Sequence, residues 1–113
     1  KLLKDIRKEF ETNLFIPGST EGVNIELEKA LRLNDFITMG ELIAYDALNR
    51  NESCGGHFRE EYQTEEGEAK RDDENYFYVS CWEYQGSDDV APVLYKEPLV
   101  YEAIKVQTRN YKS

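Results

Sequence analysis

The sequence contains few of the residues on which several classes of protein depend. Its 113 residues include two cysteines, one histidine, three prolines and one methionine. Cys54 and Cys81 are too few for a disulfide framework, so we expect a reduced, intracellular protein. No G-x-G-x-x-G fingerprint follows a strand pattern, which argues against a dinucleotide-binding fold within these residues.

Long apolar runs and an excess of positive charge are also missing. No stretch approaches the length of a membrane span, and no basic start followed by an apolar run indicates a signal peptide. Acidic residues outnumber basic ones by 23 to 14, which gives a formal charge of −9. Such a surface is repelled by nucleic-acid phosphates and anionic headgroups, so we expect neither nucleic-acid binding nor direct membrane insertion. The length and the 40% of hydrophobic residues predict one globular domain with a modest core.

The first segment has the periodicity of an amphipathic helix, from Lys1 to about Leu14. Its apolar positions are Leu2, Leu3, Ile6, Phe10 and Leu14, and charged residues cover the opposite face. The run from Phe15 to Gly18 contains Pro17 and ends the helix, because the residue before a proline disfavours helical geometry.

A second and longer helix is predicted from Glu21 or Asn24 to Arg50, with Ser19, Thr20 or Asn24 as its N-cap. An apolar seam alternates three and four residues along it: Leu33, Phe36, Gly40, Ile43 and Ala47. Further leucines widen this surface beyond what one partner helix covers. We therefore expect an incomplete bundle that lacks at least one helix, and self-association through the exposed apolar patch.

The pattern changes after Arg50. Residues 52–75 hold nine acidic and three basic residues, a net of −6, and predict a surface loop. The aromatic, β-rich run Tyr76–Tyr84 predicts a strand, and a turn over Gln85–Asp89 leads to a second strand over Val90–Tyr95. Leu99–Val106 is expected to be extended, and the tail after Gln107 is polar. The predicted fold is thus mainly α: two helices of an incomplete bundle, an acidic loop and a β-hairpin.

The segment from Asn49 to Glu61 concentrates the residues with chemical potential, and three interpretations stay open. Cys54 and His57 could form a nucleophile and base, although their spacing of three is unusual for that chemistry. Cys54, His57 and Cys81 could bind a metal with a carboxylate, but a single Cys-x-x-His is a weak zinc signal. In the third and favoured interpretation the segment is structural, with glycines turning the chain and charged side chains fixing it or reaching a neighbouring domain.

Two motifs in this region resemble a known family. The first is Asn51-Glu-Ser-Cys-Gly-Gly-His-Phe-Arg-Glu-Glu-Tyr62, and the second is Arg71-Asp-Asp-Glu-Asn-Tyr76. They are similar to the signature E-S-R-G-x-H-x-R-x-D-x-P followed by R-D-D-E-N and an aromatic residue, found in the C-terminal domain of succinate dehydrogenase and fumarate reductase flavoproteins. The chain departs from that pattern at Cys54, where many members have arginine, at Glu61 and over Gln63–Lys70.

The resemblance implies a spectrin-repeat-like three-helix bundle that packs on the flavin-binding domain of the same chain, and it implies that the first helix of this bundle lies upstream of Lys1. In the parent subunit, FAD exchanges hydride with succinate or fumarate, and an iron–sulfur subunit is a partner. The implied location is the cytoplasmic side of the membrane, as a peripheral part of a membrane-anchored complex. No catalytic, cofactor-binding or metal-binding residue of the family is carried over to this chain, which is expected to be inactive alone and to hold no cofactor itself.

The candidate site is therefore an interdomain contact. Its expected residues flank and include the two adjacent glycines: Glu52, Ser53, Gly55, Gly56, His57 and Arg59. The main alternative is a stand-alone acidic interaction module that binds a basic partner through residues 60–74.

Overall fold

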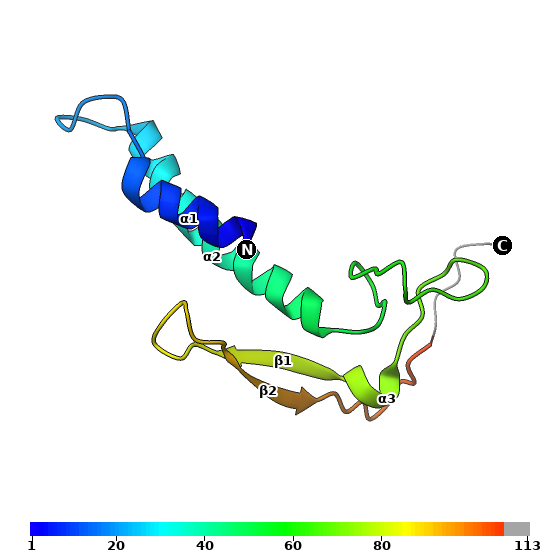
Figure 1. The fold of residues 1–113 in the computed structure, drawn as a ribbon. Helices are drawn as coiled ribbons and strands as arrows, with labels where there is room; N and C mark the ends of the chain where they lie inside the picture. Colours follow the sequence, from blue (N-terminus) through cyan, green and yellow to red (C-terminus); the bar gives the residue numbers. More distant parts are fainter. Residues whose placement is uncertain (108–113) are drawn as a thin grey trace. The chain divides into compact units, whose positions relative to one another are not determined.

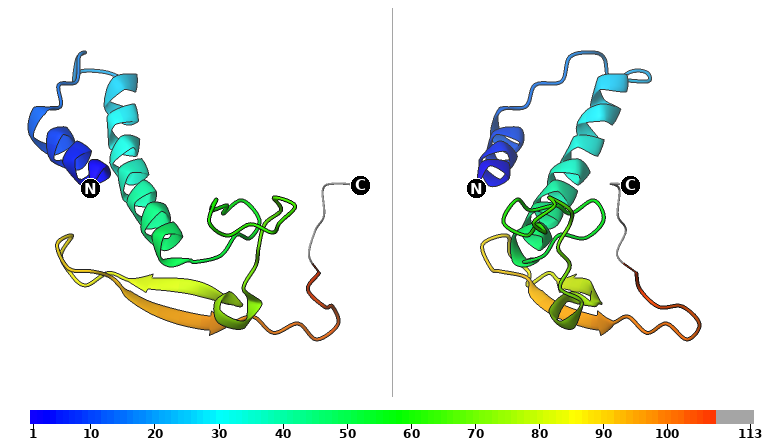
Figure 2. Two further views of the ribbon diagram at one scale, coloured as in Figure 1. Left: turned by 45° about the vertical axis from the view of Figure 1, so that its right-hand side comes forward. Right: turned by 90° about the vertical axis from the view of Figure 1, so that its right-hand side faces the viewer.

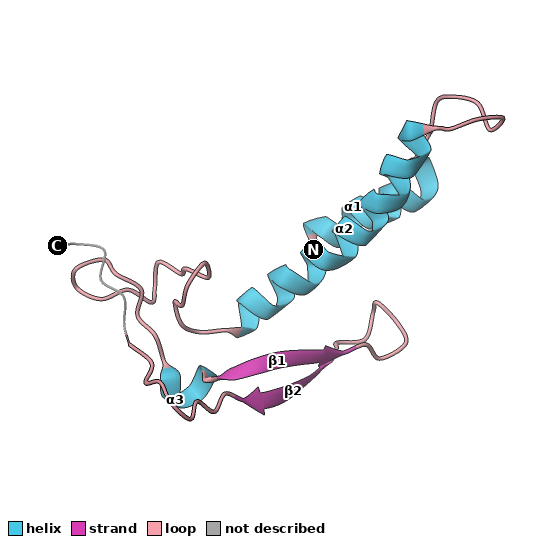
Figure 3. Ribbon diagram, turned by 180° about the vertical axis from the view of Figure 1, so that it is seen from behind, coloured by secondary structure: helices cyan, strands magenta, loops and turns pink. Residues whose placement is uncertain are grey.

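The computed structural model describes residues 1–107 of the chain. These residues form two compact units, one ending at Leu48 and the other beginning at Asn49. The elements are α1 (Leu2–Asn13), α2 (Ile25–Asn49), α3 (Asp73–Tyr76), β1 (Tyr78–Glu83) and β2 (Val93–Pro98) (Figure 3). The predicted combination of helices with a β-hairpin is confirmed. The polar tail predicted after Gln107 lies outside the described residues.

The first unit is a helical hairpin in which α1 and α2 run antiparallel and side by side (Figures 1 and 2). Both helices lie close to the predicted limits. Helix α1 ends at Asn13 because Leu14 already has an extended backbone, with φ −73° and ψ 127°. The chain then reverses through Gly18, whose φ of +115° lies in the region that favours glycine.

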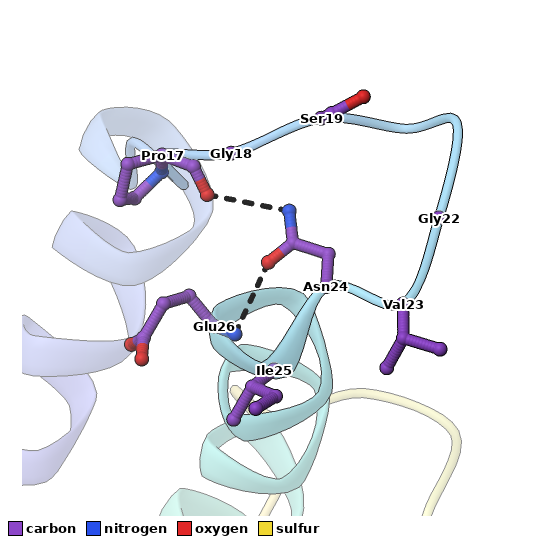
Figure 4. A pocket seen from close by; sticks show the side chains of 8 residues that line it. All are labelled: Pro17, Gly18, Ser19, Gly22, Val23, Asn24, Ile25 and Glu26. Carbon is purple, nitrogen blue, oxygen red and sulfur yellow. Dashed lines mark hydrogen bonds between the residues drawn. The ribbon is translucent and has the colours of Figure 1, made fainter.

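Asn24 links the hairpin loop to the start of α2 (Figure 4). Its side-chain oxygen accepts hydrogen bonds from the backbone N–H groups of Glu26 and Leu27, both at 3.1 Å. Its amide nitrogen donates to the carbonyl of Pro17 at 3.2 Å. Of the three predicted capping candidates, Asn24 is therefore the one that satisfies the free donors of the helix terminus.

Replacing this cap should weaken the helical hairpin measurably. We expect Asn24→Ala to lower the free energy of unfolding by about 1 kcal/mol, because two N–H groups at the helix start lose their acceptor. Urea unfolding followed by circular dichroism measures the change, with Asn13→Ala at the exposed end of α1 as the matched control. Equal effects of the two substitutions would show that Asn24 does not act as a cap.

Gly40 and Glu41 of α2 contact α1, and Ile37, about one turn away on the same face of α2, is 4% exposed. Gly40 lies against Leu3, whose side chain is 3.6 Å from where a Cβ would stand. Beside them Arg7 donates to Glu41 at 2.7 Å and to Thr38 at 3.2 Å. The interface thus has an apolar centre and a half-buried ion pair at its side, and the ion pair fixes which residues of α2 face α1.

The predicted seam of α2 is therefore only partly the contact with α1. Gly40 faces Leu3, but Leu33, Phe36 and Ile43 remain exposed. The helix carries more apolar residues than one neighbour can cover, so periodicity alone did not identify the stripe centred on Ile37. The exposed stripe is consistent with the expectation that two helices leave apolar surface uncovered.

The second unit contains the antiparallel hairpin of β1 and β2, with α3 immediately before it (Figure 2). Tyr78 pairs with Pro98, and Glu83 pairs with Val93. The predicted strand starting at Tyr76 was two residues too early, because the Asp72 side chain accepts a hydrogen bond from the backbone N–H of Asn75 and caps the short helix α3. Residues 73–75, expected as the end of the surface loop, therefore belong to this helix.

The second strand was also predicted too early, at Val90–Tyr95 instead of Val93–Pro98. The connection is longer than expected: Gly86 has a φ of +82°, and the N–H of Val90 bonds the carbonyl of Ser87 at 3.2 Å. Pro98 is tolerated because it is the last residue of β2. Beyond it the predicted extended segment 99–106 forms no strand, and only Leu99 continues the ladder, through its N–H to Phe77 O at 3.2 Å.

Candidate functional site

The candidate segment begins directly after α2 and reverses in a tight turn. The N–H of Cys54 donates to His57 O at 2.8 Å, and the N–H of His57 donates to Cys54 O at 3.1 Å. Gly55, at the turn, has a φ of +59°, which a side chain would strain. The turn therefore accounts for the glycine at position 55.

Ser53 anchors this turn from inside and has no exposed surface. Its hydroxyl accepts a hydrogen bond from the N–H of Arg59 at 2.8 Å and lies 3.2 Å from the carbonyl of the same residue, to which it donates. Its own N–H donates to Lys70 O at 2.9 Å. One small side chain thus closes the loop between residues 53 and 59.

Glu52 is the other buried residue of the segment, at 2% exposure. One carboxylate oxygen lies 2.6 Å from the guanidinium of Arg50, and the other accepts the N–H of Asp72 at 2.9 Å. A buried carboxylate is tolerated only when it is paired and hydrogen-bonded, and both oxygens of Glu52 are. Glu52 therefore connects the end of α2 with the start of α3.

Arg50 extends the same network to the hairpin. Its Nη2 donates to the carbonyls of Tyr76 and Tyr78 at 3.3 and 3.1 Å. The guanidinium carbon also lies 5.7 and 5.5 Å from the ring centroids of these two tyrosines. A planar cation with several donors can make these contacts together, whereas a lysine ammonium cannot. Arg50 was not among the predicted site residues, and only the fold brings Tyr76 and Tyr78 to it.

His57 and Arg59 converge on the backbone at the end of α2. The Nε2 of His57 donates to Arg50 O at 3.0 Å, and Nη1 of Arg59 donates to the same carbonyl at 3.3 Å. Arg59 also donates to the side-chain oxygen of Asn51 at 2.8 Å and to Glu61 Oε1 at 2.5 Å. The pKa of Glu61 is lowered because its carboxylate accepts hydrogen bonds from its own backbone N–H and from Arg59.

The predicted site residues therefore divide into two groups. Glu52 and Ser53 are turned inward and form their bonds within the chain. Gly55 and Gly56 have open space around them, because a Cβ built on either would meet nothing within 4 Å. His57 and Arg59 are half-buried. The surface that this loop offers to a neighbour is thus centred on the glycine pair.

The catalytic interpretations gain no support from this geometry. His57 directs Nε2 to a backbone carbonyl, and its pairing with Cys54 is between backbone groups. Within residues 1–107, no three side chains of histidine, cysteine, aspartate or glutamate come together as a metal would require. The site is a hydrogen-bonded scaffold.

The acidic loop has its own internal order. The N–H of Thr64 donates to Glu68 O at 2.8 Å, and Gly67, with a φ of +80°, donates to Thr64 O at 2.9 Å. At the end of the loop Arg71 contacts Asp73 at 2.5 Å. Burial would lower the pKa of Arg71, but its hydrogen bond to Asp73 and that carboxylate's charge outweigh the effect and raise it.

A sequence family described as "Fumarate reductase flavoprotein C-term" matches residues 1–111. The match spans the helical hairpin, the glycine-containing turn, the acidic loop and the β-hairpin. No solved structure matches the chain. Across residues 1–107, none of the helices has both the length and the apolar character needed to cross a membrane.

Proposed function

The chain belongs to the fumarate reductase flavoprotein C-terminal family, and on this premise we propose that it packs on the flavin-binding domain of the same chain as a non-catalytic support. The observation that carries the proposal is the family match over residues 1–111. In the parent subunit, FAD carries out the interconversion of fumarate and succinate. This chain supplies surface and stability, and its own residues hold no cofactor.

The helical hairpin supports a packing role because its apolar residues exceed its internal interface. Phe36 and Ile43 lie seven residues apart on one face of α2 and are 65% and 63% exposed. We propose that a third helix covers this face and completes a spectrin-repeat-like bundle. Leaving apolar side chains of this size in contact with water is costly. Burial of this surface would therefore drive the binding of the third helix.

The glycine-containing turn is the proposed interdomain contact. Glu52 and Ser53 set its shape from inside, while Gly55, Gly56, His57 and Arg59 form its accessible side. The iron–sulfur subunit is the further proposed partner of the parent complex, which we place on the cytoplasmic side of the membrane as a peripheral part of a membrane-anchored assembly.

Gly56 offers a sharp test of this contact. Its φ is not in the left-handed region and nothing in the chain lies within 4 Å of an added Cβ. We therefore expect Gly56→Leu to change the unfolding free energy of this chain by less than about 0.5 kcal/mol. In the intact flavoprotein the same substitution should lower the melting temperature and increase flavin loss, since the leucine would enter the interdomain contact.

Gly22→Leu is the matched control, because Gly22 lies in the α1–α2 loop and an added Cβ would also meet nothing within 4 Å there. It should leave flavin retention unchanged. Flavin retention and melting temperature that stay at the wild-type values in Gly56→Leu would contradict the proposed contact.

A stand-alone acidic interaction module is the second candidate. The observation in its favour is the exposure of Glu60, Glu65 and Glu66 on the ordered loop. Such a module would bind a basic partner with strongly salt-dependent affinity. Salt-resistant association with the flavin-binding domain would favour the first proposal.

A further inference from the structure

The second unit contains a polar pocket that the proposed packing role does not use. It has a volume of about 470 Å³ and is lined by three tyrosines, three asparagines, an aspartate, Leu94 and Lys96. Its walls come from the end of α2, the acidic loop, α3 and both strands. A pocket with these walls combines flat aromatic surface with many hydrogen-bonding groups.

Much of the acceptor capacity of this lining is already used within the chain. The carboxylate of Asp72 accepts from the backbone N–H of Asn75 at 3.2 Å and from its side-chain amide at 3.1 and 2.9 Å. The side-chain oxygen of Asn51 accepts from Arg59 at 2.8 Å. What Asn51 has left to offer is its NH₂ group, which is a donor.

The cations around the pocket differ in how their charge is balanced. Arg50 pairs with Glu52, and Arg59 pairs with Glu61. Lys96 lies with its ammonium 4.4 Å from the ring centroid of Tyr78 and forms no ion pair with any residue in the described part of the chain. An ammonium offers three donors and no acceptor.

The tyrosine rings further restrict what can bind. Arg50 and Lys96 lie over Tyr78, Arg50 also lies over Tyr76, and Arg59 lies 5.2 Å from the centroid of Tyr62. A cationic ligand would compete with these groups for the faces of the rings. A doubly charged phosphate is a poor match for this pocket. One ammonium does not balance its charge, and the two nearby arginines already form ion pairs with glutamates.

We propose that this pocket binds a single carboxylate group, held by the ammonium of Lys96 and the side-chain amide of Asn51, with its carrier against the tyrosine rings. The inference is independent of the proposed packing role. The carboxylate has two conceivable sources, a free small acid or an acidic side chain from elsewhere in the parent protein. The same donors would recognise either one.

Benzoate is a suitable probe, with benzyl alcohol as its uncharged analogue and inorganic phosphate as a second anion. In an NMR titration of the ¹⁵N-labelled chain at constant ionic strength, benzoate should shift pocket resonances saturably. Benzyl alcohol should bind at least about tenfold more weakly, because it lacks the charge-assisted hydrogen bond of the carboxylate. Phosphate should also bind more weakly than benzoate, because its double charge is poorly matched by one ammonium. Lys96→Met should weaken benzoate binding to the same extent, and Lys105→Met should not.

Equal binding of benzoate and benzyl alcohol, no binding, or binding unchanged by Lys96→Met would overturn the proposal. Repeating the titration on the intact flavoprotein separates the two sources. Binding to both proteins identifies a site for a free carboxylate. Binding to this chain alone indicates that a carboxylate of the parent protein already fills the pocket.

Discussion

Arg50→Ala is expected to cost the second unit about 3 to 5 kcal/mol, because it leaves the carboxylate of Glu52 buried without its charge partner. The same substitution removes the donors to Tyr76 O and Tyr78 O and the cation that lies over both rings. Urea unfolding followed by tyrosine fluorescence or near-UV circular dichroism measures the change. Hydrogen exchange should locate it in the turn, α3 and β1.

Arg32→Ala is the matched control for this prediction. Arg32 forms an ion pair with Glu28 one helical turn away, and both side chains are more than half exposed. Removing such a surface pair should change stability by less than about 0.5 kcal/mol. Similar effects of the two substitutions would mean that the Arg50–Glu52 pair is not the central support of the turn. Arg50→Lys should recover only part of the loss, because a lysine cannot reach Glu52 and both carbonyls together.

Ile37→Ala should have the second large effect, a loss of about 2 to 4 kcal/mol from the helical hairpin. Ile37 is the one buried apolar side chain among the described residues, so its truncation opens a cavity where α1 and α2 meet. The melting of the helical signal in circular dichroism, read alongside hydrogen exchange of α1 amides, measures the loss.

Ile43→Ala provides the control on the same helix with the same change of side chain. Ile43 is 63% exposed, so its truncation in this chain should cost less than about 0.5 kcal/mol. In the intact flavoprotein the cost should rise toward that of Ile37→Ala if a third helix covers this face. A cost that stays small in the intact protein would contradict the proposed three-helix bundle.

The sequence predicted the helices better than it predicted how they pack. Helix α2 was bounded well because Asn24 is a strong capping residue and the apolar period continues to its end. Apolar periodicity could not identify the stripe that faces α1, because Asn34, Thr38 and Glu41 on this stripe are polar. They lie on the side of α2 next to α1, where Arg7 bonds all three, and this pairing depends on the antiparallel packing of two helices.

The candidate site was predicted only in part, because local sequence determines its turn but not its contacts with residues far along the chain. The turn at Cys54–His57 follows from two adjacent glycines, and the structure places the turn there. The roles of Arg50 and Asp72 could not be read from sequence, because the partners of Arg50 at Tyr76 and Tyr78 lie 26 and 28 residues away. The inward orientation of Glu52 depends on the backbone of Asp72, which lies 20 residues away in sequence.

The central claim is that this chain works as part of a flavoprotein subunit. The most direct test is to immunoprecipitate it from its source cells under native conditions and to determine the mass and flavin content of what is recovered. We predict a polypeptide several times heavier than 13.2 kDa that carries FAD. A flavin-free band at 13.2 kDa would contradict the assignment and leave the acidic interaction module as the better account.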